Sequence, residues 1–189
     1  MYTFEKSDRS LTLRPENTAG VVRSFIENGM SRLPMPVKLW YKGPMFRYER
    51  PQKGRYRQFE QFGIECIGAK SPMLDAEGIA LGYSIIRALG LQNVRVRVNS
   101  LGDDESRKAY REKLQAYFQP RISEFCADCQ RRLVQNPLRI LDCKVDANHP
   151  LLEDVPLISD SLNEASREYF EEVLKCLDAL DIPYVVDPN

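Results

Sequence analysis

The sequence predicts an α+β fold in which a strand-rich body carries a mostly helical insertion. Short runs that alternate apolar and polar residues recur in the first half of the chain, which is the pattern of half-buried strands. After Gly102 the chain is rich in charged residues, and its apolar residues recur at the spacing of a helix. It returns to an extended run at "IPYVV". We therefore expect a core at 1–102, a helical insertion domain at 103–182 and a return strand to the core at 183–189.

The elements of the core follow from local patterns. "SLTLRP" alternates and stops at Pro15, which is typical of a strand that runs into a turn. The spacing in "TAGVVRSFIENGM" predicts a helix with Thr18 as its cap and Gly29 as its stop. "MPVKLWYKGPMFRYE" and "YRQFEQFGIECIGA" are extended runs on either side of the polar turn "RPQKG". They predict a β-hairpin with a long basic tip, in which Pro44 marks a bulge or an edge position.

The remaining elements are mostly helical. "SPMLDAEGIALGYSIIRALG" predicts a helix that ends at Gly90, and "VRVRVNS" predicts a strand with Val94, Val96 and Val98 on its buried face. We expect "NPLRILDCK" to be a short connector and 150–160 to be irregular. "NEASREYFEEVLKCLDAL" has the periodicity of an amphipathic helix.

Charge and composition narrow the classes of function. Among 189 residues, 27 Lys and Arg balance 27 Asp and Glu, so any nucleic-acid contact must come from local patches. No apolar run approaches the length of a membrane span, and Met1 does not open a signal-peptide pattern. Five cysteines without a secretory signal indicate reduced thiols. We expect a soluble cytoplasmic protein.

One cysteine spacing suggests a metal site. Cys126-x-x-Cys129, followed by Cys143 and His149, could supply four zinc ligands. Since Cys143 and His149 do not form a second closely spaced pair, the sequence favours ordinary reduced cysteines over structural zinc. His149 is the only histidine and lies in the loop-like stretch "DANHPLL", so hydrolysis through a proton relay is not expected.

The predicted hairpin concentrates positive charge and polar groups. Five cations fall within eleven residues: Arg47, Arg50, Lys53, Arg55 and Arg57. Strand alternation places two sets of side chains on one surface of the sheet: Arg47 and Glu49 from the first strand, and Arg57, Phe59, Gln61, Gly63 and Glu65 from the second. Buried charges cost several kcal/mol unless they are paired, so such a face is poor core material. The alternative is a solvated face.

This set of side chains suits a ligand with two different ends. Guanidinium groups hold phosphate or carboxylate oxygens with two bonds, and the Phe59 ring can stack under a purine. Gln61 and Glu65 suit a cationic group or one with N–H donors, and Gly63 leaves room for a substrate close to the sheet. The sequence has no glycine-rich phosphate loop, so the cations of the hairpin would bind any phosphates.

Three stretches carry a resemblance to a known family. "LTLRPENTAG", "LWYKGPMFRYERPQKGRYRQFEQFGIE" and "NPLRILDCK" closely resemble the catalytic core of the bacterial histidyl-tRNA synthetase family. Phe46 to Glu49 and Arg55 to Phe59 look like motif 2 of class II aminoacyl-tRNA synthetases. The resemblance runs over essentially the whole chain. It implies a partial class II antiparallel sheet flanked by helices, with the insertion domain near the tRNA acceptor stem.

The resemblance also implies a reaction and its partners. Histidine would attack the α-phosphate of ATP to give histidyl-adenylate and pyrophosphate, and the acyl group would then move to tRNA(His). Mg²⁺ would accompany ATP and bridge its phosphates rather than occupy a protein cage. No tightly bound cofactor or protein-held metal is expected. The full-length protein would be a homodimer without membrane association.

Roles at the ATP end carry over from the family residue by residue. Arg47 would bridge the α-phosphate and the histidine carboxylate and stabilise the transition state by its fixed charge. Arg55 would hold the γ-phosphate. Glu49 would contact the adenine amino group, and Phe59 would stack on the adenine ring.

Roles at the histidine end carry over in the same way. Glu16 and Thr18, with Asn17 between them, would receive the α-amino group of histidine. Gln61 and Glu65 would fix the substrate, with Glu65 as partner of its imidazole.

Contacts with tRNA are expected from two places. Gln52 and Lys53 in the loop would approach the acceptor end. Several insertion-domain cations could touch phosphates, although a solvated helix face is the stronger interpretation for any one of them: Arg107, Lys108, Arg111, Arg131 and Arg132.

The resemblance further implies that the chain is a fragment. It begins after the family's motif 1 and ends at "VVDPN", before the histidine-specific "Arg-Gly-Leu-Asp-Tyr-Tyr" segment, motif 3 and the anticodon-binding domain. We therefore expect this chain to be inactive in aminoacylation by itself. The alternative is a regulatory or binding protein on the same fold, such as the synthetase-like subunit of ATP phosphoribosyltransferase or a tRNA-sensing domain.

Overall fold

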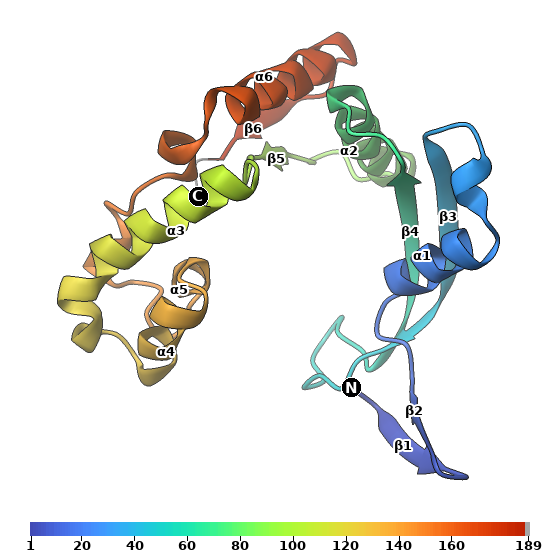
Figure 1. Ribbon diagram of the computed structural model, residues 1–189, viewed down its shortest axis with the longest axis horizontal. Coiled ribbons are helices and arrows are strands. Elements are labelled where there is room, and N and C mark those ends of the chain that lie inside the picture. The colour runs from blue at the N-terminus through green and yellow to red at the C-terminus, as the bar shows by residue number, and fades with distance from the viewer. Residues whose placement is uncertain (188–189) are drawn as a thin grey trace. The chain divides into compact units, whose positions relative to one another are not determined.

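The computed structural model describes residues 1–187 and confirms the α+β class (Figure 1). The chain divides into two compact units, Met1–Leu74 and Asp75–Asn189. The predicted boundaries near residues 102 and 182 stay predictions, and residues 188 and 189 of the expected return strand lie outside the described residues. Within residues 1–187, no helix combines the length and the apolar character needed to cross a membrane.

The first unit is built on the predicted hairpin. β3 (Val37–Phe46) and β4 (Gln58–Ile67) pair antiparallel, with Met45 opposite Phe59 and Tyr41 opposite Gly63. A second antiparallel pair joins β1 (Thr3–Lys6) to β2 (Arg9–Thr12). β2 overlaps the first half of the predicted "SLTLRP" run, whereas β1 was not expected. α1 (Thr18–Glu27) and a 3₁₀ turn, η1 (Met30–Arg32), complete the unit.

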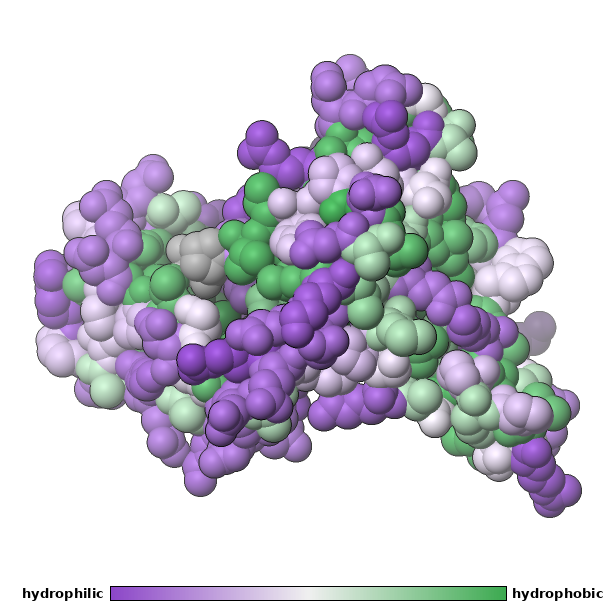
Figure 2. Space-filling model, turned by 90° about the horizontal axis from the view of Figure 1, so that it is seen from above, coloured by the Kyte–Doolittle hydropathy of each residue, from purple (hydrophilic) through white to green (hydrophobic). Residues whose placement is uncertain are grey.

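Alternation along the hairpin separates two faces. Side chains at the odd positions of β4 are half-buried, and those at Gln58, Glu60, Phe62 and Cys66 are exposed. Trp40 on the outer face is 71% exposed, and its ring lies 6.2 Å from that of Phe62. Elsewhere too, exposed apolar residues interrupt the polar surface, and the face drawn in Figure 2 shows such residues in green.

α1 begins one residue earlier than predicted. Asn17 is the N-cap and Thr18 the first helical residue, so the expectation that Thr18 caps the helix is wrong. The Thr18 hydroxyl instead donates to the Glu65 carboxylate (2.7 Å), and the Glu16 carboxylate accepts from the Ala19 N–H (3.3 and 3.4 Å). Gly29 has φ +61° just beyond the helix, which confirms the predicted stop because glycine adopts left-handed backbone without steric cost.

The second unit is largely helical. In chain order its elements are α2 (Pro72–Ala88), β5 (Val96–Val98), α3 (Asp104–Phe118), η2 (Gln119–Glu124), α4 (Ala127–Gln135), α5 (Leu138–Leu141), η3 (Pro150–Leu152), η4 (Ile158–Ser161), α6 (Glu164–Ala179) and β6 (Tyr184–Val186). α2 starts just before the boundary between the units. β5 and β6 pair in parallel, in contrast to the antiparallel pairs of the first unit. The strand predicted from Val94 is shorter than expected and starts at Val96.

Two apolar clusters form the core of the second unit. One joins α3, α4, α5 and η4 around Leu114, Phe118 and Ile140, and the other packs α6 against α2, β5 and β6 through Val173 and Leu177. "NPLRILDCK" is therefore not a plain connector. It forms the short helix α5, because Ile140 contributes a fully buried side chain to the first cluster.

Candidate active site

The segment Arg14–Thr18, which we call the RPENT segment, is held along the hairpin by main-chain and side-chain hydrogen bonds. The Phe46 N–H donates to the Arg14 carbonyl (2.9 Å), and Arg14 Nε donates to the Pro44 carbonyl (2.9 Å). At the other end, the Thr18 hydroxyl reaches Glu65. These bonds bring the candidate residues of the RPENT segment and those of the hairpin together within one unit.

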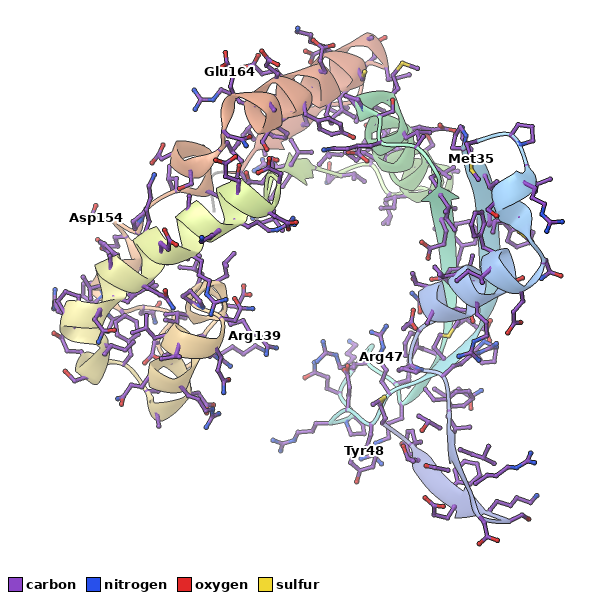
Figure 3. The ribbon with its side chains drawn as sticks, in the orientation of Figure 1. Met35, Arg47, Tyr48, Arg139, Asp154 and Glu164 are labelled. Carbon is purple, nitrogen blue, oxygen red and sulfur yellow. The ribbon has the colours of Figure 1, made fainter. Side chains whose placement is uncertain are left out.

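Arg47 lies at the point where β3 passes into the loop, beside the labelled Tyr48 (Figure 3). Its Nε donates to the Pro15 carbonyl (2.9 Å), and its guanidinium carbon lies 4.9 Å from the centre of the Phe59 ring. The other four N–H donors of the guanidinium belong to its two terminal nitrogens, which this bond does not use. The prediction that Arg47 and Phe59 lie side by side is confirmed. The hydrogen bond to the Pro15 carbonyl orients the Arg47 guanidinium group.

Residues 47–57, which we call the basic loop, follow strand alternation only in part. The Arg47 N–H donates to the Arg57 carbonyl (2.9 Å), so the main-chain pairing continues one step beyond the strands. The Arg57 side chain, however, stacks on the Tyr48 ring at 4.6 Å and donates to the Glu49 carbonyl (3.1 Å). The expectation that Arg57 shares the face of Phe59 is therefore wrong, because alternation fixes side-chain direction only inside a strand.

Glu49 and Arg55 form an ion pair across the basic loop. Arg55 Nε lies 3.0 Å from Glu49 Oε2, with side-chain exposures of 57% and 36%. An exposed pair of this kind contributes about 0–1 kcal/mol. Because this ion pair is weak, a group that binds Arg55 more strongly, such as a phosphate, can replace the Glu49 carboxylate.

The tip of the basic loop is a tight turn. The main chains of Gln52 and Arg55 exchange two hydrogen bonds (2.9 and 3.3 Å). Gly54 adopts φ +77° within this turn, a conformation that side chains other than glycine rarely take. Gln52 and Lys53 are consequently exposed at the tip of the turn.

The half-buried side of β4 carries Phe59, Gln61, Gly63 and Glu65, which we call the polar face. Gln61 Nε2 contacts the Tyr41 hydroxyl at 3.5 Å, whereas Gln61 Oε1 is buried without a hydrogen-bond partner among the described residues. Reversing the assignment of the amide would only exchange which end lacks a partner. A buried polar group without a partner costs about 1–3 kcal/mol, so the polar face holds a group that a ligand can satisfy.

Gly63 serves a different purpose from the one predicted. A Cβ atom at this position would lie 2.3 Å from the Tyr41 ring, so the space above Gly63 holds Tyr41 rather than a substrate. Tyr41 was missed by sequence reasoning, although its place directly opposite Gly63 in the hairpin register could have indicated it. The tyrosine thereby becomes the protein neighbour of Gln61.

Glu16 and Asn17 lie at the start of α1. The Glu16 carboxylate accepts from the second N–H of the helix, where the helix dipole favours negative charge. A Cβ atom at Gly20 would lie 2.8 Å from Asn17 Oδ1, so the glycine lets the Asn17 amide lie against the helix. Two carboxylates, Glu16 and Glu65, thus flank Thr18 at the end of the site that suits a cationic group.

The insertion-domain arginines mostly bind groups of their own unit. Arg111 donates to the carbonyls of Val134 and Gln135 at the end of α4 (2.7 and 3.3 Å). Arg131 pairs with Asp128, and Arg107 with Asp104. Arg132 also donates to the Arg139 carbonyl (3.1 Å), so four of the five candidate cations bind groups of their own unit.

A separate cluster in the second unit joins Cys126, Cys129, Cys143 and Asp146, and we call it the cysteine cluster. Its four ligand atoms lie within 4.8 Å of one another. His149, the fourth ligand considered from the sequence, is not part of it: its ring stacks on Phe125 at 4.0 Å, and Nδ1 accepts from the Leu151 N–H. All five cysteines of the chain are free thiols.

Ionisation in the cysteine cluster differs from group to group. The Cys126 thiol, which donates to Asp146, lowers the pKa of that carboxyl to about 2. Burial, with the neighbouring carboxylate of Asp146, raises the pKa of the Cys129 thiol. The backbone N–H of Asp146 lowers the pKa of the Cys143 thiol. The sequence pattern was interpreted with His149 as the fourth ligand, and Asp146 was not considered. Cys143-x-x-Asp146 nevertheless repeats the spacing of Cys126-x-x-Cys129.

Comparison with known proteins decides the family. Residues 2–171 match the model of the tRNA synthetase class II core domain (G, H, P, S and T). The chain belongs to this family. Over its whole length, the chain is 60% identical to histidine–tRNA ligase 1 of Shouchella clausii and to the histidine–tRNA ligase of Bacillus subtilis. It spans 45% of the length of each of these relatives.

Solved structures agree with this assignment. Histidyl-tRNA synthetase of S. aureus, solved as the apo protein, superposes with a TM-score of 0.79 at 50% identity, over all of this chain and 44% of that one. An ATP phosphoribosyltransferase regulatory subunit/histidyl-tRNA synthetase from Bacillus halodurans C gives a TM-score of 0.62 at 17% identity, over 98% of this chain and 52% of that one. The second likeness establishes a shared fold alone.

Proposed function

We propose that this chain carries part of the adenylation site of an ATP-dependent histidine–tRNA ligase. The observation that carries the proposal is the attachment of the RPENT segment to the hairpin, with Arg47 on the Pro15 carbonyl and Thr18 on Glu65. It sets a cationic end and an acidic end along one polar face. The identity to histidine–tRNA ligases supports histidine as the amino acid.

At the ATP end, Arg47 binds the α-phosphate and the histidine carboxylate, and its fixed charge stabilises the negative charge that develops during attack. Its Nε bond to Pro15 holds the guanidinium before substrates arrive. Arg55 exchanges Glu49 for the γ-phosphate, and the released Glu49 carboxylate accepts from the adenine amino group. Adenine stacks on the face of Phe59 that Arg47 leaves open. Mg²⁺ enters with ATP on its phosphate oxygens.

At the histidine end, the α-amino group lies between Glu16 and Thr18, next to Asn17. Gln61 offers its partnerless Oε1 to an N–H of the substrate, and Glu65 binds the imidazole. Each substrate group then meets a protein group of opposite charge or complementary hydrogen bonding. Gln52 and Lys53 at the loop tip contact the acceptor end of tRNA(His), and the full-length protein acts as a homodimer.

The test is histidine-dependent exchange of labelled pyrophosphate into ATP by the full-length protein. Arg47→Ala should lower the exchange rate about 100- to 1000-fold, the usual effect of removing one donor to a transition-state oxygen. Lys42→Ala is the matched control, since Lys42 belongs to the same hairpin but is exposed on its outer face. It removes one positive charge without touching the polar face and should leave the rate unchanged.

Two results would count against the proposal. Equal exchange by the Arg47→Ala and Lys42→Ala proteins would mean that the hairpin is not the adenylation site. A folded full-length protein that exchanges with no amino acid would favour a regulatory or binding role on the same fold. The expectation that the 189-residue chain alone is inactive stays a prediction, which tRNA charging by that chain would contradict.

A further inference from the structure

We propose that the cysteine cluster is a structural zinc site with Cys126, Cys129, Cys143 and Asp146 as its four ligands. This inference is independent of the proposed adenylation site, because all four residues lie in the second unit and none contributes to the hairpin. It also departs from the expectation of ordinary reduced cysteines. That expectation rested on the lack of a second closely spaced ligand pair, and Asp146 supplies one.

Two distances within the cluster match those of a tetrahedral zinc site. A zinc ion about 2.3 Å from two sulfurs and about 2.0 Å from an oxygen places the sulfurs about 3.8 Å apart and the oxygen about 3.5 Å from each sulfur. Cys126 Sγ and Cys143 Sγ are 3.8 Å apart, and Cys143 Sγ lies 3.4 Å from Asp146 Oδ2. Two of the six distances thus match the edges of a zinc tetrahedron, and all four ligand atoms lie within 4.8 Å of one another.

Local backbone structure presents the four ligands in two matched pairs. Cys126 is the N-cap of α4 and Cys129 lies in its first turn, whereas Cys143 and Asp146 follow α5 with the same three-residue spacing. The Cys126 N–H donates to both oxygens of Asp146 (3.2 and 3.3 Å), which orients the carboxylate. Hydrogen bonds that orient a ligand in this way are typical of metal sites.

Burial and charge favour a closed, structural site. Cys129 is fully buried and Cys143 is 5% exposed, and both belong to the apolar cluster around Leu114 and Phe118. Three thiolates and a carboxylate exceed the charge of Zn²⁺ by two. Arg132 lies beside Cys129 and donates to the Arg139 carbonyl (3.1 Å), so a cation stands next to the excess charge. Four protein ligands leave no position for substrate, as in structural rather than catalytic zinc sites.

The first measurement is metal content and cobalt spectroscopy on the reduced 189-residue chain. We expect one zinc per chain, and we expect Co²⁺ to give the thiolate charge-transfer and strong visible bands of a tetrahedral site. Cys129→Ser should abolish these bands. Asp146→Asn should weaken zinc binding by at least the 10- to 100-fold that loss of an orienting partner causes. Cys176→Ser is the control, because Cys176 lies in α6 outside the cysteine cluster.

Several outcomes separate the possibilities. Zinc at one per chain in both the wild type and Cys176→Ser, with at least tenfold weaker zinc binding by Asp146→Asn, supports the site. If Cys129→Ser does not fold, a fall in the unfolding temperature of the wild type on chelation still supports it. A folded chain without bound zinc and without cobalt bands would overturn it.

Discussion

The two units of the chain are stabilised in different ways. In residues 1–74 the buried apolar side chains are Val21, Val37 and Met45, and much of the structure depends on polar contacts between the RPENT segment and the hairpin. The second unit instead has two apolar clusters. Polar and charged side chains are poor core material unless a partner satisfies them. The difference indicates that the second unit is stabilised by apolar packing, whereas the first unit depends more on polar contacts between its segments.

The helix starts show the same contrast. At α3, Asp103 accepts from the Ser106 N–H (2.9 Å), and at α6, Asn163 accepts from the Ser166 N–H (3.0 Å). The two caps also bind each other, because Asn163 Nδ2 donates to Asp103 (2.8 Å). The cap of α1, Asn17, makes no such side-chain bond. The helix next to the candidate site thus lacks the side-chain cap that α3 and α6 of the second unit have.

The largest expected effect is a difference between the two units in the free energy that a core substitution removes. Leu114→Ala, in a fully buried position, should lower the free energy of opening of α3 and α4 by about 2–5 kcal/mol. Val21→Ala should lower that of α1 by a smaller amount, about 1–2 kcal/mol, since it removes less buried carbon. Native-state hydrogen exchange measures both helices separately. Equal losses in β3–β4 and in α3 for Leu114→Ala would mean that the chain opens as one body.

A smaller effect tests whether the polar face trades stability for binding. Gln61→Met keeps the length of the side chain and removes the buried Oε1 that lacks a partner. We expect the free energy of unfolding to stay equal or rise by up to about 1 kcal/mol, because the cost of the unpaired group disappears. Histidine binding to the full-length protein should weaken about tenfold, the equivalent of one hydrogen bond.

Calorimetric titration and urea unfolding measure these two quantities. Gln58→Met is the matched control, as it makes the same exchange on the exposed side of the same strand. It should change neither quantity. A Gln61→Met protein that loses stability and binds histidine normally would show that the amide is structural.

Sequence patterns predicted the regular parts of the site and missed the parts that depend on chain path. Period-two alternation placed Phe59, Gln61 and Glu65 on one face, since a strand leaves little choice of direction. It could not place Arg57, which lies in the basic loop and turns to Tyr48. It also could not show that Tyr41 fills the space above Gly63, because this requires the register of the opposite strand.

The same limit applies to the second unit. Helical periodicity predicted α2 and α6, but "NPLRILDCK" was expected to be a connector because four helical residues give no periodic signal. Asp146 and His149 are both plausible ligands by residue type. Only the turn after α5 decides between them, by directing Asp146 to the cysteines and His149 to the Phe125 ring.

The smallest expected effect concerns the cap of α3 and its dependence on pH. The backbone N–H of Ser106, followed by the Asn163 amide, lowers the pKa of Asp103 from 3.8 to about 2. A carboxyl whose pKa is lower in the folded state contributes stability at pH values above its unfolded pKa of 3.8, and this contribution is lost as the pH falls towards 2.

Asp103→Asn keeps an acceptor at the cap and removes the charge, whereas Asp103→Ala removes the acceptor as well. Urea unfolding across this pH range should therefore show Asp103→Asn below the wild type near neutral pH and equal to it near pH 2. Asp103→Ala should lie below Asp103→Asn at every pH, because an alanine cannot cap the helix. If wild type and Asp103→Asn stay parallel throughout, the charge of Asp103 does not stabilise the cap, and the closed pair of caps that distinguishes the second unit depends on hydrogen bonds alone.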